Sequence, residues 1–297
     1  MTNQEMLGVG RPVTPFQAPF CAEDKTIAAQ RFEDGRVSKA EYKHCTFINV
    51  SFKGTTIEES KFLDCTFIHC YFRYANLKNC SFVGSRFIDC RFPHLAVSIC
   101  DFMYATFTGC TISSKEMAYS MPAQDNLREE LARNLSVEAG RLGMPYESGT
   151  YREIEIQARE GHLWAAVVAK SQWYRDHFDP LARVQAFSEY TLSLLNRWML
   201  GYGVRPSILV RNWLIASVLI FPLTYWMMKG QWAGADTSAT LISALLFSLK
   251  NSIPATLPSN LMPNSFLSIL LALIQAIYSG ITIAFLASHI FRWSIQR

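Results

Sequence analysis

Carboxylate side chains are almost missing from the last third of the chain. Between positions 206 and 297 the sequence holds one acidic residue, Asp236. The basic residues of that stretch are Arg211, Lys229, Lys250, Arg292 and Arg297. The whole chain is 18% charged, against roughly 25% for an ordinary soluble domain. This uneven shortage predicts a nearly charge-free membrane domain behind a charged soluble part.

Signatures of other protein classes are also missing. The first residues lack the basic start and apolar core of a secretory signal, so we expect the long polar part to be cytoplasmic. We find no nucleophile elbow, P-loop, dinucleotide-binding glycines or zinc spacing, and expect no enzyme, no catalytic residue, no cofactor and no metal. The net charge of +4, without a basic stripe interleaved with aromatics, gives no ground for nucleic-acid binding and disfavours an acidic DNA mimic.

A period of five residues is the main positive signal. Neither a helix nor a plain strand has this period. It places an apolar residue at Phe32, Val37, Tyr42, Phe47, Phe52, Ile57, Phe62, Phe67, Phe72, Leu77, Phe82, Phe87, Phe92, Val97, Phe102, Phe107 and Ile112. A second, mostly small series precedes each by two places. We predict a square coil in which both series point inward, with about four turns and a length of roughly 20 Å at the usual strand spacing.

The local motifs strengthen this interpretation. Ala75-Asn76-Leu77 matches the motif A-(D/N)-L-x-x, and Cys65-Thr66-Phe67 and Cys90-Arg91-Phe92 match C-x-F. The pattern resembles the pentapeptide-repeat family. The resemblance implies a right-handed quadrilateral β-helix over residues 31–118, after an N-terminal extension of residues 1–30.

The cysteines and histidines fit the same frame. All cysteines except Cys21 fall at the small inward position, several of them twenty residues apart, and we expect them to pack in the core as free thiols. A cytoplasmic setting also disfavours disulfides. His44, His69 and His94 are spaced by five sides and do not converge, so we expect surface positions rather than a metal site.

A helical part follows the repeat. Apolar spacing predicts helices from about Asp125, over about Tyr151–Ser171 and from about Pro180 to Met199, within a cytoplasmic helical domain of residues 119–205. Tyr151-Arg152-Glu153, with Glu155 and Arg159 after it, and the Gly201–Pro206 turn are similar to bacterial proteins that join pentapeptide repeats to a channel-like membrane domain. The Gly201–Pro206 turn precedes the first span, so we interpret it as a juncture and not as a potassium filter.

Two membrane spans are expected within residues 206–297. Trp213–Met228 is uncharged and extends back through Ser207–Val210, and Phe266–Phe291 is longer. Basic residues flank the entry to the first span and the exit from the second. We therefore expect both termini in the cytoplasm of a cell whose inner (plasma) membrane the chain crosses twice, with residues 229–265 on the far side.

The segment between the spans indicates a pore. Thr237–Leu249 is apolar but too short to span, and a proline-containing loop follows it as far as Pro258. Span, re-entrant helix, loop and span resemble the potassium-channel pore family, in which Phe247-Ser248-Leu249 matches the end of the pore helix. The family's T-x-G-Y-G filter is missing, so the resemblance does not imply potassium selectivity.

Residues near this loop are the candidates for contact with ions. Those that we expect to line a pore or set its selectivity are Lys250, Asn251, Ser252, Pro254, Thr256 and Gln275. The alternative for Lys250 is an outer vestibule or the lipid headgroups. Gly280 is a candidate for a gating hinge or, preferably, for close helix packing. The lack of acidic residues favours a pore that is anion-permeable or poorly selective.

Two spans cannot enclose a pore alone. The channel hypothesis therefore requires a homo-oligomer in the lipid bilayer, with a tetramer favoured by the pore-family resemblance and a pentamer also open. Its other partners would be inorganic ions. The competing hypothesis is a membrane-anchored pentapeptide-repeat scaffold that binds a protein and conducts nothing.

Overall fold

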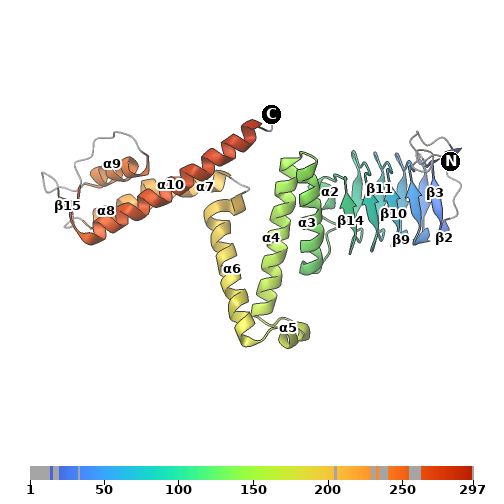
Figure 1. Cartoon of the computed structure of the whole chain (residues 1–297), viewed down its shortest axis with the longest axis horizontal. Coiled ribbons are helices and arrows are strands. Elements are labelled where there is room, and N and C mark those ends of the chain that lie inside the picture. The colour runs from blue at the N-terminus through green and yellow to red at the C-terminus, as the bar shows by residue number, and fades with distance from the viewer. Residues whose placement is uncertain are drawn as a thin grey trace. The chain divides into compact units, whose positions relative to one another are not determined.

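The computed structural model describes residues 14–15, 20–32, 34–203, 206–228, 232–233, 240–253 and 262–295 (Figure 1). The chain divides into two compact units, Met1–Tyr190 and Thr191–Arg297, and each is described by itself. The first holds a β-solenoid of about four turns and several helices, and the second holds the apolar helices.

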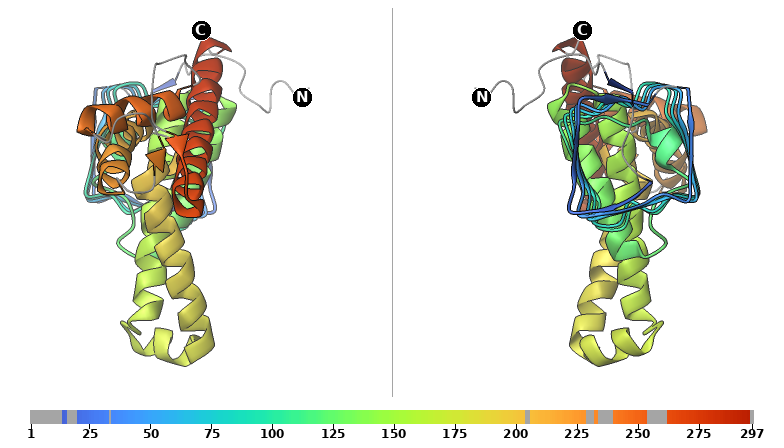
Figure 2. Two further views of the ribbon diagram at one scale, coloured as in Figure 1. Left: turned by 90° about the vertical axis from the view of Figure 1, so that its left-hand side faces the viewer. Right: turned by 90° about the vertical axis from the view of Figure 1, so that its right-hand side faces the viewer.

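Parallel ladders form the walls of the solenoid. Three sides are the ladders β3-β7-β10-β12-β14, β5-β8-β11-β13 and β2-β6-β9. On the fourth side, single parallel bridges join Arg31, Ser51, Tyr71, Arg91 and Thr111 in turn. Seen along the rod, the turns superpose as a square (Figure 2, right). The strands are β1 (Thr14–Pro15), β2 (Cys21–Glu23), β3 (Thr26–Ala28), β4 (Gln30–Arg31), β5 (Arg36–Ser38), β6 (Glu41–Lys43), β7 (Thr46–Ile48), β8 (Thr56–Glu58), β9 (Lys61–Leu63), β10 (Thr66–Ile68), β11 (Asn76–Lys78), β12 (Arg86–Ile88), β13 (Ala96–Ser98) and β14 (Thr106–Thr108).

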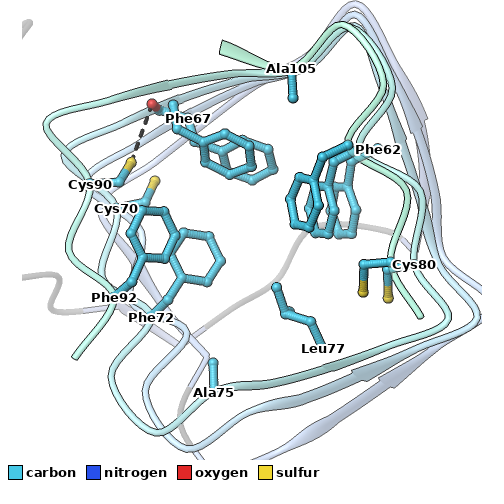
Figure 3. Close-up of a cluster of buried hydrophobic side chains, with 14 of the residues drawn as sticks. Phe62, Phe67, Cys70, Phe72, Ala75, Leu77, Cys80, Cys90, Phe92 and Ala105 are labelled. Carbon is cyan, nitrogen blue, oxygen red and sulfur yellow. Dashed lines mark hydrogen bonds between the residues drawn. The ribbon is translucent and has the colours of Figure 1, made fainter. Parts of the chain in front are cut away.

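One turn of the solenoid is twenty residues long. Phe67 pairs with Phe47 of the preceding turn and with Phe87 of the following turn. In each of these two pairs the rings stack, with 4.8 Å between their centroids. The rings of one side meet those of the next edge to face (Figure 3). The predicted inward positions from Val37 to Ile112 are buried, which confirms the five-residue frame.

The solenoid begins earlier than the expected boundary at residue 31. Strand β2 pairs with β6 and strand β3 pairs with β7, both in the twenty-residue register. Ile27 is buried in the core at the inward position of β3. The repeat is harder to recognise there because the other inward position of this stretch that the structure describes, Ala22, is small and only partly buried.

The cysteines pack as predicted. All except Cys21 are buried, and all eight are free thiols. In the column of Cys70, Cys90 and Cys110, the Cys90 thiol donates to Phe67 O at 3.4 Å (Figure 3). Burial raises the pKa of the Cys65 thiol to about 12. A buried thiol packs as a small apolar group, so these columns are part of the hydrophobic core.

Thiol chemistry tests this assignment. A thiol whose pKa is raised to about 12 is almost wholly protonated at pH 8, and only the thiolate attacks disulfide reagents. We expect Ellman's reagent at pH 8 to modify only Cys21 in the native chain and all eight thiols in denaturant. The Cys21→Ser variant should give no native reaction, and fast native modification of a second thiol would contradict the buried columns.

The corners of the square impose a second constraint. One residue in every five, from Asp24 to Gly109, has φ between 49° and 70°. Glycine, asparagine and aspartate adopt this left-handed conformation most readily, and β-branched residues least. Half of these corners carry glycine, asparagine or aspartate, but Ile99 occupies one at φ 55° and is 74% exposed.

Ile99 is therefore a strained position that a substitution should relieve. Replacing Ile99 with Asn removes a β-branched side chain from the left-handed region and should stabilise the solenoid by about 1 kcal/mol. The thermal midpoint of the β-sheet circular-dichroism signal measures the change. Ile99→Val, which keeps the branch at Cβ, is the control and should show no gain.

Helices close the C-terminal end of the solenoid. They are α2 (Ser114–Met117), α3 (Asp125–Arg141) and α4 (Pro145–Val167). Asn134 of α3 accepts from Phe107 N at 2.8 Å, and Glu138 accepts from Gly109 N at 2.8 Å. Tyr151 of α4 donates to Ile112 O at 3.0 Å. Side chains thus pair with the backbone groups that a further turn would have satisfied.

Two more helices complete this region. The sequence predicts α4 and α6 (Pro180–Leu200) but not α5 (Gln172–His177), which lies between them. The start of α4 at Pro145 also precedes the expected start near Tyr151, since proline is well suited to the first helical turn. Arg159 of α4 pairs with Glu189 of α6 at 3.1 Å, and the Trp164 and Tyr190 rings lie 5.2 Å apart.

Among the residues that the structure describes, two helices are long and apolar enough to cross a membrane, judged by length and composition, and both lie in the second unit. They are Pro206–Met227 and Phe266–Ser288, with 33% and 17% of their apolar windows buried. The first is made of α7 (Pro206–Ile215), a π-helical turn (Ala216–Ile220) and α8 (Phe221–Met227). The wide turn comes just before Pro222, which has no N–H to donate. The second lies within α10 (Phe266–Ile295), and the shorter α9 (Leu241–Ser252) is also apolar.

Candidate functional site

The C-terminal end of α9 is hydrogen-bonded near the middle of both long helices. Ser248 Oγ donates to Ser217 O at 2.7 Å, and Ser252 Oγ lies 2.9 Å from Ser217 Oγ. Ser217 is about 15 Å from either end of the Pro206–Met227 helix at 1.5 Å per residue. The α9 helix therefore reaches about half-way along this helix with its last turn.

Gln275 of α10 lies at the centre of this cluster and is fully buried. Its Nε2 lies 2.9 Å from Ser248 O and 2.7 Å from Ser252 Oγ. Its Oε1 accepts from the Tyr225 hydroxyl of α8 and from Asn251 Nδ2, which also donates to Ala272 O at 2.7 Å. One glutamine thus joins three helices in a buried polar cluster of Ser217, Tyr225, Ser248, Asn251, Ser252 and Gln275.

The segment that carries α9 starts and ends at one place. Strand β15 (Trp232–Ala233) follows α8, strand β16 (Met262–Pro263) precedes α10, and the two pair antiparallel. Phe247, in the second half of α9, packs edge to face on Tyr225 of α8 at 5.1 Å. The described residues thus place β15, after the first long helix, beside β16, before the second, while the last turn of α9 lies half-way along the first long helix.

The structure brings together some of the predicted site residues. Asn251, Ser252 and Gln275 meet in the buried polar cluster, but the side chains of Ser252 and Gln275 are enclosed by their own chain. This differs from the expected pore-facing position, because an enclosed side chain has no surface to offer to a pore shared between copies. Pro254 and Thr256 lie outside the described residues.

Lys250 and Gly280 lie on the surface of the second unit. Lys250 is exposed in the last turn of α9, next to the buried polar cluster. The residues described between 206 and 295 include no carboxylate, so Lys250 has no acidic partner there. A Cβ added to Gly280 would meet no atom within 4 Å. The preferred prediction, close packing at Gly280, is therefore not realised within a single chain.

Sequence reasoning missed Ser217, Tyr225 and Ser248. Each is a polar residue in an otherwise apolar helix, and Ser248 and Ser252 are four residues apart on one face of α9. The four-residue spacing of Ser248 and Ser252 was the signal that the sequence offered for a polar face on α9. The partners lie 31 and 27 residues from Ser248, in different helices, so spacing alone could not pair them.

Removing Gln275 tests whether the buried polar cluster holds α9 in place. Gln275→Leu deletes the group that links the three helices and leaves the α9 hydroxyls without this partner. A buried hydrogen bond contributes about 0.5–1.5 kcal/mol and several are lost together, so we expect a loss of about 2 kcal/mol and faster hydrogen exchange in α9. Ile274→Leu, on the exposed side of α10, is the control. Unchanged exchange in Gln275→Leu would contradict this role.

The remaining surfaces hold less chemistry. A shallow groove of about 480 Å³ on the solenoid is lined by His69, Cys70, Tyr71, Asp89, Arg91 and Gly109. His44, His69 and His94 lie at separate corners of the turns and are all exposed, as predicted. Among the described residues, no group of three or more His, Cys, Asp or Glu side chains could hold a metal ion.

Comparison with known proteins identifies the repeat. Residues 31–117 match the family model described as a pentapeptide repeat region. A search of curated proteins finds no match. Among solved structures, a pentapeptide repeat protein from the Arabidopsis thaliana thylakoid lumen is 16% identical, with 37% of this chain and 76% of that chain covered and a TM-score of 0.32.

Two trypsin-treated variants of QnrB1, a plasmid-mediated fluoroquinolone resistance protein, are also similar. They are 15% and 19% identical to this chain, cover 31% of it, and are themselves covered over 70% and 56% of their length. Their TM-scores are 0.18 and 0.12. The expectation of a pentapeptide-repeat β-solenoid is confirmed, and the resemblance to a channel pore stays a prediction.

Proposed function

Since residues 31–117 form a pentapeptide repeat region and the second unit holds two apolar helices, we propose that the protein is an oligomeric ion channel. The two long helices would span the bilayer and α9 would be a re-entrant pore helix. The solenoid would lie in the cytoplasm with both termini, and the membrane would be the inner (plasma) membrane.

The exposed Lys250 at mid-depth is the observation that carries this proposal. Its neighbours Ser248 and Ser252 are bonded to Ser217, half-way along the first long helix. A lysine ammonium at the centre of a bilayer costs about 2.5–3.5 kcal/mol or more unless it meets water or a counter-charge. Because the described part of this unit has no carboxylate, water in a pore is the partner that relieves this cost.

A pore of this kind needs several copies around one axis. A rotationally symmetric tetramer, or a pentamer, would place one Lys250 from each copy around the lumen. A ring of lysines attracts anions and repels cations. We therefore propose an anion-permeable or poorly selective pore, in which Lys250 contacts the permeating ion and Asn251, Ser252 and Gln275 hold α9 in position.

Reversal potentials test the role of Lys250. In planar bilayers under a salt gradient, the wild-type channel should reverse towards the chloride equilibrium potential. Lys250→Glu inverts the charge of the ring and should move the reversal potential towards the cation equilibrium value. Lys250→Arg keeps the charge and is the matched control.

Two outcomes would contradict the channel proposal. One is the absence of conductance from an assembled, folded protein. The other is a conductance whose reversal potential is the same in wild type, Lys250→Glu and Lys250→Arg, because Lys250 would then face headgroups or an outer vestibule.

A membrane-anchored scaffold is the second candidate, and one face of the solenoid favours it. Lys53 and Arg73 lie one turn apart, and Arg91 follows Tyr71 in the same series of bridges. The Arg73 guanidinium lies 4.9 Å above the Tyr74 ring, and Tyr74 stacks on His94 at 5.0 Å. These residues are up to 41 positions apart in sequence, so the linear sequence shows no basic stripe. We call this set of residues the basic face of the solenoid. Its positive charge is complementary to an acidic partner protein.

A further inference from the structure

Helix α6 exposes its large apolar side chains. The exposed fractions are 78% for Leu181, 66% for Val184, 50% for Phe187, 65% for Leu192, 51% for Leu195 and 64% for Trp198. At 100° per residue these six side chains fall within an arc of about 140° on one side of the helix. We call this set the α6 apolar stripe.

The opposite side of α6 packs against its own chain. Ala186 is buried there, and Glu189 pairs with Arg159 of α4. Ala182 and Ser193, on the same side, are half-buried. An ordinary surface helix turns its apolar side inward and its polar side to water. In α6, Ala186 and Glu189 face the chain and Leu194 is half-buried, whereas the side chains of the α6 apolar stripe face away from the chain.

The area of the α6 apolar stripe is large for a lone chain. Six large side chains that are at least half exposed present on the order of 600 Å², at the upper end of the apolar patches found on monomers. A standard interface buries about 800 Å² on each partner. The stripe therefore supplies most of one side of a stable protein interface.

Chain connectivity favours a second copy of this chain as the partner that covers the α6 apolar stripe. Helix α6 ends at Leu200, a 3-10 turn covers Gly201–Gly203, and α7 begins at Pro206. If the α7 and α10 helices of several copies are arranged around one symmetry axis, the α6 helices are arranged around the same axis, because only a few residues connect α6 to α7. An apolar side on each copy would then meet its equivalents.

The low net charge of α6 disfavours a lipid surface as the partner of the α6 apolar stripe. Helices that lie in a membrane interface carry many Lys and Arg residues on their polar side. The charged residues of α6 are Arg183, Glu189 and Arg197, and Glu189 partly offsets the two arginines. This low net charge suits protein contact better than attraction to anionic headgroups.

We propose that α6 is the assembly helix of the oligomer and that its apolar stripe packs against the α6 helices of other copies. This inference rests on the proposed function for the existence of an oligomer, and adds which surface forms it outside the membrane. Trp198 and Leu195, nearest to the spans, would be at the centre of the contact, since copies are held closest together there.

Cysteine cross-linking of the full chain tests the contact directly. In a Cys21→Ser background, Leu195→Cys places a thiol on the stripe, and Ser193→Cys places one on the opposite side of the same turn. Reconstituted in lipid nanodiscs, Leu195→Cys should form covalent dimers on mild oxidation. Ser193→Cys, whose thiol faces its own chain, should not.

A second variant keeps the proposal falsifiable if cross-linking is blocked by geometry. Leu195→Glu with Trp198→Ser places a charge and a small polar group in the stripe. Mass photometry should show loss of the oligomer, while the β-sheet signal of circular dichroism stays unchanged. An oligomer that keeps its mass in this variant, or equal cross-linking of the Leu195→Cys and Ser193→Cys chains, would overturn the proposal.

The two proposals fail in different ways. If Leu195→Cys cross-links specifically but Lys250→Glu leaves the reversal potential unchanged, the assembly role of α6 stands and the pore role of Lys250 falls. If Leu195→Cys stays monomeric and a spin label at that position reports a lipid environment instead, the stripe is a membrane-surface helix and the assembly role falls, whatever the conductance.

Discussion

Backbone polar groups that are removed from water need partners, and this requirement shapes both units. In the solenoid each turn satisfies the N–H and C=O groups of the turn before it, so only the ends of the rod have open groups. Asn134, Glu138 and Tyr151 meet those groups at the C-terminal end. In the described part of the second unit the backbone groups pair mainly within helices, and hydroxyl and amide side chains connect one helix to the next.

The same requirement explains why Gln275 has so many partners. A short helix that ends half-way along its neighbours would leave its last carbonyl groups open in an apolar environment. Gln275 reaches Ser248 O, and Asn251 turns back to Ala272 O. The buried polar cluster therefore fixes where α9 ends, and with it where the exposed Lys250 lies. The proposed ion path depends on this placement more than on any other feature.

Much of the fold could be predicted from the sequence because it repeats. A five-residue period identifies the inward positions of the solenoid without any knowledge of long-range contacts, and Phe47, Phe67 and Phe87 are buried where it places them. The early start at β2 and β3 was missed, since Ala22 gives a weaker signal than phenylalanine. The two long apolar helices could be predicted from length and composition. The buried polar cluster did not, because Ser217, Ser248 and Gln275 come from three helices and no period relates them. The basic face of the solenoid was also missed, because residues that are neighbours in space lie twenty positions apart in the sequence.

The left-handed corners have an evolutionary consequence. Every fifth residue must accept a positive φ, and every side must begin in phase with the one below it. Inserting or deleting a single residue would therefore turn core side chains outward in all later turns. A change of five would keep the core but rotate each later face by a quarter turn, so that surface features such as the basic face would no longer line up. Only the gain or loss of twenty residues preserves both, and the rod can thus change its length during evolution in steps of one whole turn, about 5 Å each.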